Sequence, residues 1–245
     1  MTTAIMFALI LLGASLPGIL WLVFFLREDL HPVPRRLLVY TFGAGALSSL
    51  FVLTFQFVFH ELVAERIAWL IVPLLGLAVI EETFKFLAAY FAAWRDRDFR
   101  EPMSAMVLAL AAALGFAGVE NLFALSGAAE MFDFSSLYSV GYVVLVRFVG
   151  ATMLHALAAG IVGYYWAKAT FKGPFLRQIL IGLAWATGIH TAFNWLVVRY
   201  QGEDLLLYPA LFLVFILFFV VTDFEILREN ERYSDALSGV RHAEK

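Results

Sequence analysis

The sequence predicts an all-α polytopic membrane protein with about seven transmembrane helices in one bundle. Of its 245 residues, 62% are hydrophobic and only 15% are charged, and the mean hydropathy is +0.85. These values lie far outside the range of soluble globular domains. Several apolar runs also reach the roughly 20 residues that a helix needs to cross a bilayer.

Seven segments are long and apolar enough to be transmembrane helices. In chain order they lie at about residues 4–26, 37–60, 67–93, 103–126, 139–167, 176–198 and 205–224. We interpret the first as a retained helix and not as a signal peptide, because no Lys or Arg precedes Arg27. The fifth is the longest, so it would have to tilt or extend beyond the hydrocarbon.

The basic residues predict the orientation of the bundle. Of the 17 Lys and Arg residues, 13 follow the first, third, fifth and seventh segments, whereas Arg66 and Arg199 lie on the opposite side. Lys85 and Arg147 lie within the spans. Because cytoplasmic loops carry the excess of Lys and Arg, the N-terminus should be outside and the C-terminus in the cytoplasm.

The chain contains no linker or repeat, so we expect one transmembrane domain over residues 1–225 and a charged cytoplasmic tail over 226–245. The net charge is −3 and no basic patch suggests nucleic acid, which leaves membrane lipid as the general partner. Cysteine is absent, and this excludes disulfides and thiolate chemistry.

Small and aromatic residues suggest how the helices pack and where they end. Glycines within the spans would let neighbouring helices approach closely. They are Gly43, Gly45, Gly115, Gly118, Gly150, Gly160 and Gly163. Tryptophans near span ends are expected to anchor the helices at the membrane interface. These are Trp21, Trp94, Trp166 and Trp195.

The strongest functional signal is a small set of polar residues inside the spans. An ionised side chain at the bilayer centre costs about 3 kcal/mol or more, so such residues indicate function by default. The set consists of Glu81, Glu82, Lys85, Glu120, Asn121, Arg147, His155, His190 and Asn194. At a rise of about 1.5 Å per residue, its glutamates and histidines lie at similar depths in the outer half of the membrane. We therefore expect four helices to converge on one site.

Some members of this set are expected to be structural. Asn121 is interpreted as a residue that joins helices by hydrogen bonds. Arg147 is interpreted as a cation that balances Glu120 or Glu82, and Lys85 as a supporting charge beside the glutamate pair. Lys85 shares a helix face with Glu81, four residues earlier.

Four motifs follow one another on separate helices. They are Glu81-Glu82-x-x-Lys85, Phe116-x-x-x-Glu120-Asn121, Arg147-x7-His155-Ala156 and His190-x-x-x-Asn194. In order and placement they resemble the PrsW family of intramembrane proteases, a branch of the superfamily that includes CAAX prenyl endopeptidases and bacteriocin-processing membrane proteases. The resemblance covers about residues 15–225.

The resemblance implies an endopeptidase in a bacterial-type cytoplasmic membrane, with Glu81, Glu82 and His190 matching the essential residues of the family. It also implies a single-span membrane protein as substrate, such as an anti-sigma factor cut at site one. The last motif often ends in Asp where this chain has Asn194. CAAX-type relatives carry His where Glu120 stands, which makes the PrsW branch the better match.

Two mechanisms are compatible with these residues. Peptide hydrolysis needs a base to activate water and donors to hold the oxyanion. In the first mechanism Glu81 or Glu82 is the base, and His190 positions the water or protonates the leaving amine. His155 and Asn194 would then donate hydrogen bonds to the oxyanion.

In the second mechanism His155, His190 and Glu120 hold a Zn²⁺ ion. Histidine and carboxylate suit zinc, but these residues lack the spacing of an HExxH motif. The sequence leaves the metal-free and the zinc mechanism equally open.

Two other classes of function share some of these features. Glu, His and Lys residues within a bundle also suit a proton-coupled transporter or channel. The chain shows neither an inverted repeat nor the paired broken helices typical of transporters. A non-catalytic scaffold that binds the transmembrane helix of a partner is the second alternative. The motifs favour the protease over both.

Overall fold

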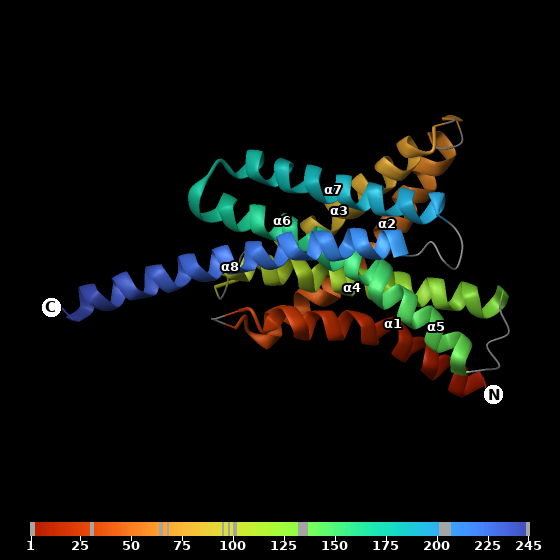
Figure 1. The fold of residues 1–245 in the computed structure, drawn as a ribbon, viewed down its shortest axis with the longest axis horizontal. Coiled ribbons are helices and arrows are strands. Elements are labelled where there is room, and N and C mark those ends of the chain that lie inside the picture. The colour runs from red at the N-terminus through yellow and green to blue at the C-terminus, as the bar shows by residue number, and fades with distance from the viewer. Residues whose placement is uncertain are drawn as a thin grey trace.

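The computed structural model describes residues 3–29, 32–63, 66–67, 69–94, 96–97, 99, 102–131, 137–200 and 207–243, which form an all-helical bundle (Figure 1). The helices are α1 (Thr3–Leu26), α2 (Arg35–Leu62), α3 (Ile71–Ala93), α4 (Pro102–Met131), α5 (Leu137–Arg147), α6 (Met153–Lys172), α7 (Phe175–Arg199) and α8 (Leu207–Ala243). A π-helical turn, η2 (Phe148–Thr152), joins α5 to α6 without a break.

Each of the seven predicted segments coincides with a helix or, for the fifth, with the continuous α5–η2–α6. Six of them are confirmed as long and apolar enough to cross a membrane. The remaining helix, α3, carries the charged residues Glu81, Glu82 and Lys85. Its 23 residues reach about 35 Å, which exceeds the hydrocarbon thickness of a typical bilayer. A seventh span through α3 stays a prediction.

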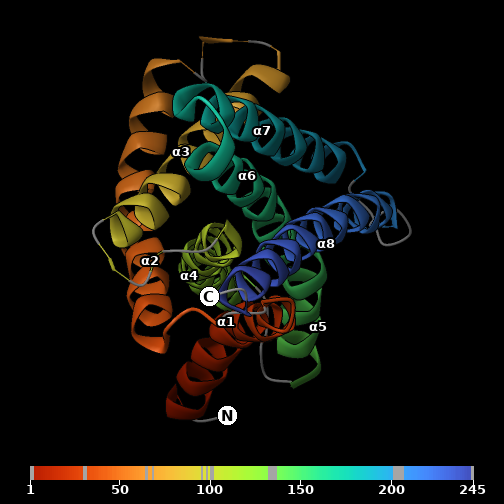
Figure 2. The ribbon, with the colours of Figure 1, turned by 90° about the vertical axis from the view of Figure 1, so that its left-hand side faces the viewer.

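Helix α4 lies at the centre of the bundle. It packs against α1, α2, α3, α6 and α8, and Figure 2 shows it enclosed by them. Its residues 103–117 are all buried. A helix that is apolar on every side is stable only when it is surrounded, and its many alanines let the neighbouring helices approach closely. This helix carries Glu120 and Asn121 into the interior.

Four glycines confirm the prediction of close helix packing. A Cβ atom on Gly45 would lie 1.9 Å from a backbone carbonyl oxygen of α4, and one on Gly115 would lie 2.0 Å from a carbonyl oxygen of α2. Gly160 and Gly163 allow similar contacts of α6 with α8 and α4. The prediction is wrong for the glycines whose added Cβ would meet nothing closer than 3.7 Å. These are Gly43, Gly118 and Gly150.

The substitution Gly45→Ala should destabilise the protein by about 1–3 kcal/mol, because the new methyl group would overlap the carbonyl oxygen of α4. Gly43→Ala is the matched control on the same helix, since an added Cβ there meets open space. It should be neutral or slightly stabilising, because Ala is preferred to Gly in helices by about 1 kcal/mol. Thermal unfolding in detergent would compare the two variants, and equal melting temperatures would contradict the close contact.

Helix α8 continues through the predicted domain boundary at residue 225, and its C-terminal end extends beyond the other helices (Figure 1). Arg228 Nη1 donates to Glu28 Oε2 at 3.1 Å. The buried Glu231 accepts at 2.9 Å from the backbone N–H of Met103, in the first turn of α4. A carboxylate at this position satisfies an N–H that has no partner within its own helix. The segment therefore contacts the bundle at least as far as Glu231. The side chains of residues 233–245 lie outside the described part.

Two of the four tryptophans lie inside the bundle and not at its ends. Trp166 is only 1% exposed. Trp21 is half-buried, and its Nε1 donates at 3.0 Å to the carbonyl oxygen of Phe148 in η2. The predicted interfacial role is wrong for both, because closeness to a span end does not determine which way a side chain points. Trp94 and Trp195 are exposed, as expected of anchors.

Candidate active site

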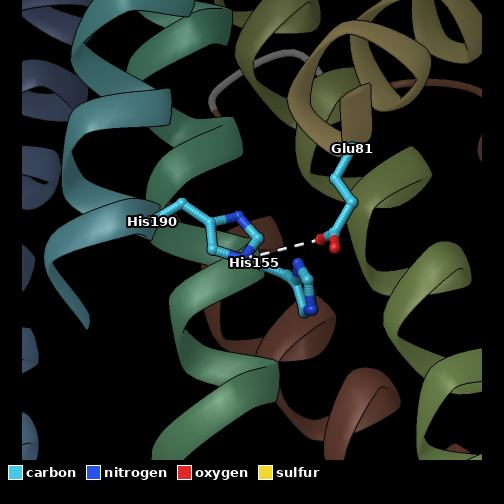
Figure 3. Close-up of side chains that lie close together, drawn as sticks. All are labelled: Glu81, His155 and His190. Atoms are coloured by element: carbon cyan, nitrogen blue, oxygen red, sulfur yellow. Dashed lines mark ion pairs between the residues drawn. The ribbon is translucent and has the colours of Figure 1, made fainter. Parts of the chain in front are cut away.

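Three of the predicted residues meet in the interior of the bundle. Glu81 on α3, His155 on α6 and His190 on α7 are buried, and one carboxylate oxygen or ring nitrogen of each lies within 4.8 Å of the others. Figure 3 shows the three side chains pointing toward one another from separate helices. We call these residues the Glu-His-His cluster. The sequence-based expectation of one site at the meeting point of several helices agrees with this arrangement.

Glu82 orients His190. The Nδ1 atom of the ring lies 2.6 Å from Glu82 Oε1, and a carboxylate can only accept, so Nδ1 carries the hydrogen. The other ring nitrogen, Nε2, faces Glu81 Oε2 at 3.5 Å. Pairs of a carboxylate and a histidine fix both the tautomer and the direction of the ring. Glu82 thereby holds His190 Nε2 toward the cluster.

Lys85 links the glutamate pair to the second histidine. Its Nζ donates to Glu82 Oε1 at 2.6 Å and to His155 Nδ1 at 2.9 Å. An ammonium group can only donate, so Nδ1 of His155 accepts and the ring hydrogen is on Nε2. That hydrogen points to Glu120 Oε2, 2.7 Å away. The predicted role of Lys85 as a charge beside the glutamate pair agrees with its ion pair to Glu82, three residues earlier.

Glu81 is held by a residue that the sequence analysis missed. Gln56 on α2 donates from Nε2 to Glu81 Oε1 at 2.7 Å. The second oxygen, Oε2, is buried and accepts no hydrogen bond from the described residues. Gln56 is a polar residue within an apolar helix, six residues before its C-terminal end. A polar residue within a span is the criterion that found the other site residues. The place of Gln56 near the predicted end of the span, at residue 60, explains why it is missing from the predicted set, which includes the amides Asn121 and Asn194.

Asn121 and Arg147 form a hydrogen-bonded network beside the cluster. Asn121 Nδ2 donates to the Ala14 carbonyl oxygen at 3.2 Å and to Thr152 Oγ1 at 3.0 Å, and its Oδ1 accepts from Arg147 Nε. These bonds join α1, α4, α5 and η2, which confirms the predicted interhelical role of Asn121. Arg147 Nη2 also lies 4.0 Å from Glu120 Oε2.

The π turn η2 accounts for the position of Arg147 relative to His155. On a regular α-helix, two residues eight positions apart point about 80° away from each other. A π turn takes up about one residue more than an α turn, so the separation corresponds to seven residues, or about 20°. Both side chains consequently reach Glu120 from one helix face.

Asn194 lies one helical turn after His190 on α7 and is half-buried. Among the residues that the structure describes, none forms a hydrogen bond with its side-chain amide. Its role as an oxyanion donor stays a prediction.

The Glu-His-His cluster has the chemistry of a zinc site. One carboxylate and two imidazoles form a ligand set of catalytic zinc sites, and Glu81 Oε2 is a buried acceptor without a partner among the described residues. The sequence hypothesis combined the two histidines with Glu120. In the structure Glu120 bonds to Nε2 of His155, and Glu81 occupies the third position of the cluster.

Comparisons with known proteins agree on one family. The protein-family model described as "PrsW family intramembrane metalloprotease" matches residues 33–222 of this chain. The protease PrsW of Geobacillus kaustophilus is 28% identical over 202 residues, which cover 79% of this chain and 81% of that protein. The protease PrsW of Bacillus subtilis is 26% identical over 224 residues, which cover 87% and 93%. No solved structure matches the chain significantly.

Proposed function

The chain belongs to the PrsW family of intramembrane metalloproteases, and from this we propose that the Glu-His-His cluster is the centre where it hydrolyses a peptide bond. As a member of this family the chain is a polytopic membrane protease of bacterial type. The family therefore favours the protease over the transporter and the non-catalytic scaffold considered from the sequence. The observation that carries the proposal is the approach of three buried polar side chains to within 4.8 Å. Burying such a cluster in a membrane bundle costs free energy, and ionisable groups in this position usually have a function.

Glu81 is the carboxylate best suited to accept a proton from the attacking water. Its Oε2 is without a hydrogen-bond partner in the described part of the chain and faces His190. Glu82 Oε2 also lacks a hydrogen bond among the described residues. Glu82 is nevertheless less suited, because its carboxylate is already balanced by the Lys85 ammonium and its Oε1 accepts from both Lys85 and His190. We therefore assign Glu82 and Lys85 to the positioning of His190.

The other groups would stabilise charge as the peptide bond breaks. Addition of water to the carbonyl creates an oxyanion that needs donors, and the leaving nitrogen needs a proton before the C–N bond cleaves. We assign the first task to Asn194 and the second to His190 Nε2. Because the ring hydrogen of His190 is on Nδ1, Nε2 would first take over the proton that Glu81 accepts from water, across 3.5 Å, and then pass it to the leaving nitrogen. His155 has both ring nitrogens engaged by Lys85 and Glu120, so donation to the oxyanion would require one of these contacts to open.

The same cluster would hold a zinc ion through Glu81, His155 and His190, provided that one ring nitrogen of His155 gives up its contact with Lys85 or Glu120. A bound zinc ion makes water a good nucleophile near neutral pH and polarises a carbonyl group. When Glu81 serves as a ligand, Glu120 is the carboxylate left beside the cluster, and its side chain is 29% exposed. Glu120 would then accept the proton of the water.

Removal of metal should abolish cleavage of a single-span reporter by the purified protein, and added Zn²⁺ should restore it. The reason is that two imidazoles and a carboxylate suit zinc better than they suit Mg²⁺ or Ca²⁺, which prefer oxygen ligands. Activity after treatment with a strong chelator, together with metal analysis of the same sample, measures this. Full activity in a metal-free preparation would eliminate the zinc site and leave Glu81 as the base.

We also propose that residues 1–225 act as one protease domain, with the N-terminus outside and the segment from 226 onward in the cytoplasm. The substrate would be a single-span membrane protein, for which the resemblance suggests an anti-sigma factor. Proteomics of ectodomains shed from cells with the natural protein or with Glu81→Ala would identify it. Identical sets of shed fragments would contradict the proposed substrate class.

A further inference from the structure

We infer that Gln56 is a positioning residue of the active site. By holding Oε1 of Glu81 it directs the other carboxylate oxygen, Oε2, toward the two histidines. Gln56 lies on α2, a helix that carries none of the predicted site residues. Its amide donates to Glu81 Oε1 at 2.7 Å. The inference rests on the proposed function of the Glu-His-His cluster.

A single hydrogen bond to a carboxylate can determine which of its two oxygens faces a given direction. The last torsion of a Glu side chain is broad, so the carboxylate by itself has little preference for which oxygen faces a given direction. The bond from Gln56 fixes Oε1 on the α2 side. Oε2 is consequently directed at His190 Nε2, 3.5 Å away, and accepts no hydrogen bond from a described residue.

Gln56 differs from the other polar residues that surround it on α2. The hydroxyl groups of Ser48, Ser49 and Thr54 all donate to carbonyl oxygens of their own helix. The amide of Gln56 instead reaches across to α3. A neutral donor in this place holds the carboxylate without cancelling its charge, whereas Lys or Arg would form an ion pair with it.

The surroundings of Gln56 also belong to the site. Gln56, Phe116, Val119 and Glu120 are among the residues that line a small crevice between α2 and α4. The amide therefore lies at the edge of the same polar region that contains Glu120. This position gives α2 a direct part in shaping the cluster.

The test is the Zn²⁺ affinity of the full-length protein in lipid nanodiscs, measured by competition with a chromogenic chelator. Gln56→Met keeps the length of the side chain and removes the donor, so Zn²⁺ should bind about 10- to 100-fold more weakly, as for other groups that orient a ligand. Gln56→Asn retains the amide on a shorter side chain and should show the same loss. Thr54→Val is the matched control on α2 and should bind as tightly as the natural protein.

A double-mutant cycle separates positioning from general loosening of the fold. Because Gln56 acts through Glu81, Gln56→Met should cause no further loss of affinity in a Glu81→Gln background. Natural affinity in folded Gln56→Met, or the same fold-loss in both backgrounds, would overturn the inference alone. No Zn²⁺ uptake by the natural protein, or full affinity in Glu81→Gln, would overturn the proposed ligand set and this inference with it.

Discussion

Glu81→Gln should lower kcat/KM for a single-span reporter by about 10²- to 10⁴-fold, the usual contribution of a general acid or base. Glutamine has nearly the same shape as glutamate but carries no charge, so it can neither accept the proton of water nor act as a carboxylate ligand. Glu81 is buried, and its Oε2 faces His190 without accepting a hydrogen bond from the described residues. Cleavage by the variant and by the natural protein, in nanodiscs of the same composition, measures the effect.

Two further variants make this result specific. Glu61→Gln removes an exposed carboxylate near the C-terminal end of α2 and should leave cleavage unchanged. Glu82→Gln should reduce cleavage less than Glu81→Gln, because we assign Glu82 to the positioning of His190. If Glu82→Gln were the more damaging variant, the role of base would pass to Glu82. Full activity in folded Glu81→Gln would remove the carboxylate from the mechanism.

Lys85→Met should destabilise the protein by about 3–5 kcal/mol, which is the typical effect of removing one partner of a buried ion pair. The Lys85 side chain is 2% exposed and the Glu82 side chain is 1% exposed, so water cannot replace the ammonium. The substitution would leave the Glu82 carboxylate buried without its cation and would also remove the donor to His155 Nδ1. Unfolding monitored by circular dichroism in detergent measures the loss.

The double variant Lys85→Met/Glu82→Gln should recover a large part of this stability, because a neutral amide needs no cation. Lys168→Met is the control. Its ammonium lies over the rings of Tyr164 and Tyr165 at 5.1 and 5.4 Å from their centroids, so the loss should stay near 1 kcal/mol. If Lys85→Met unfolded like the natural protein, the buried ion pair would have no net effect on folding.

The sequence predicts the helices well because a bilayer leaves a polypeptide few choices. Every backbone polar group must be paired within the segment, so long apolar runs become helices close to the predicted ranges. The exception is α8, which continues past the predicted end at residue 224 to Ala243. The level of the active site follows from the constant rise of a helix. Glu81 and His190 stand out because charged or titratable groups are rare at that depth.

The pairing of individual atoms does not follow from the sequence. Lys85 can reach either the third or the fourth residue before it, and only side-chain torsions decide in favour of Glu82. The depth of Glu120 likewise does not determine its partner. In the structure Glu120 bonds to Nε2 of His155, whereas Lys85 contacts Nδ1 on the other side of the ring. Gln56 comes from a helix without any charged site residue, so its bond to Glu81 becomes visible only when the helices are assembled.

The π turn between α5 and α6 changes how relatives of this protein can be searched for. Because it takes up about one residue, an unbroken α-helix with only six residues between the arginine and the histidine would present both side chains at nearly the same angle. A deletion of one residue between Arg147 and His155 is therefore compatible with an intact active site. A fixed distance between these two residues is a poor search criterion, whereas the four-residue step from His190 to Asn194 on the regular helix α7 is a strict one.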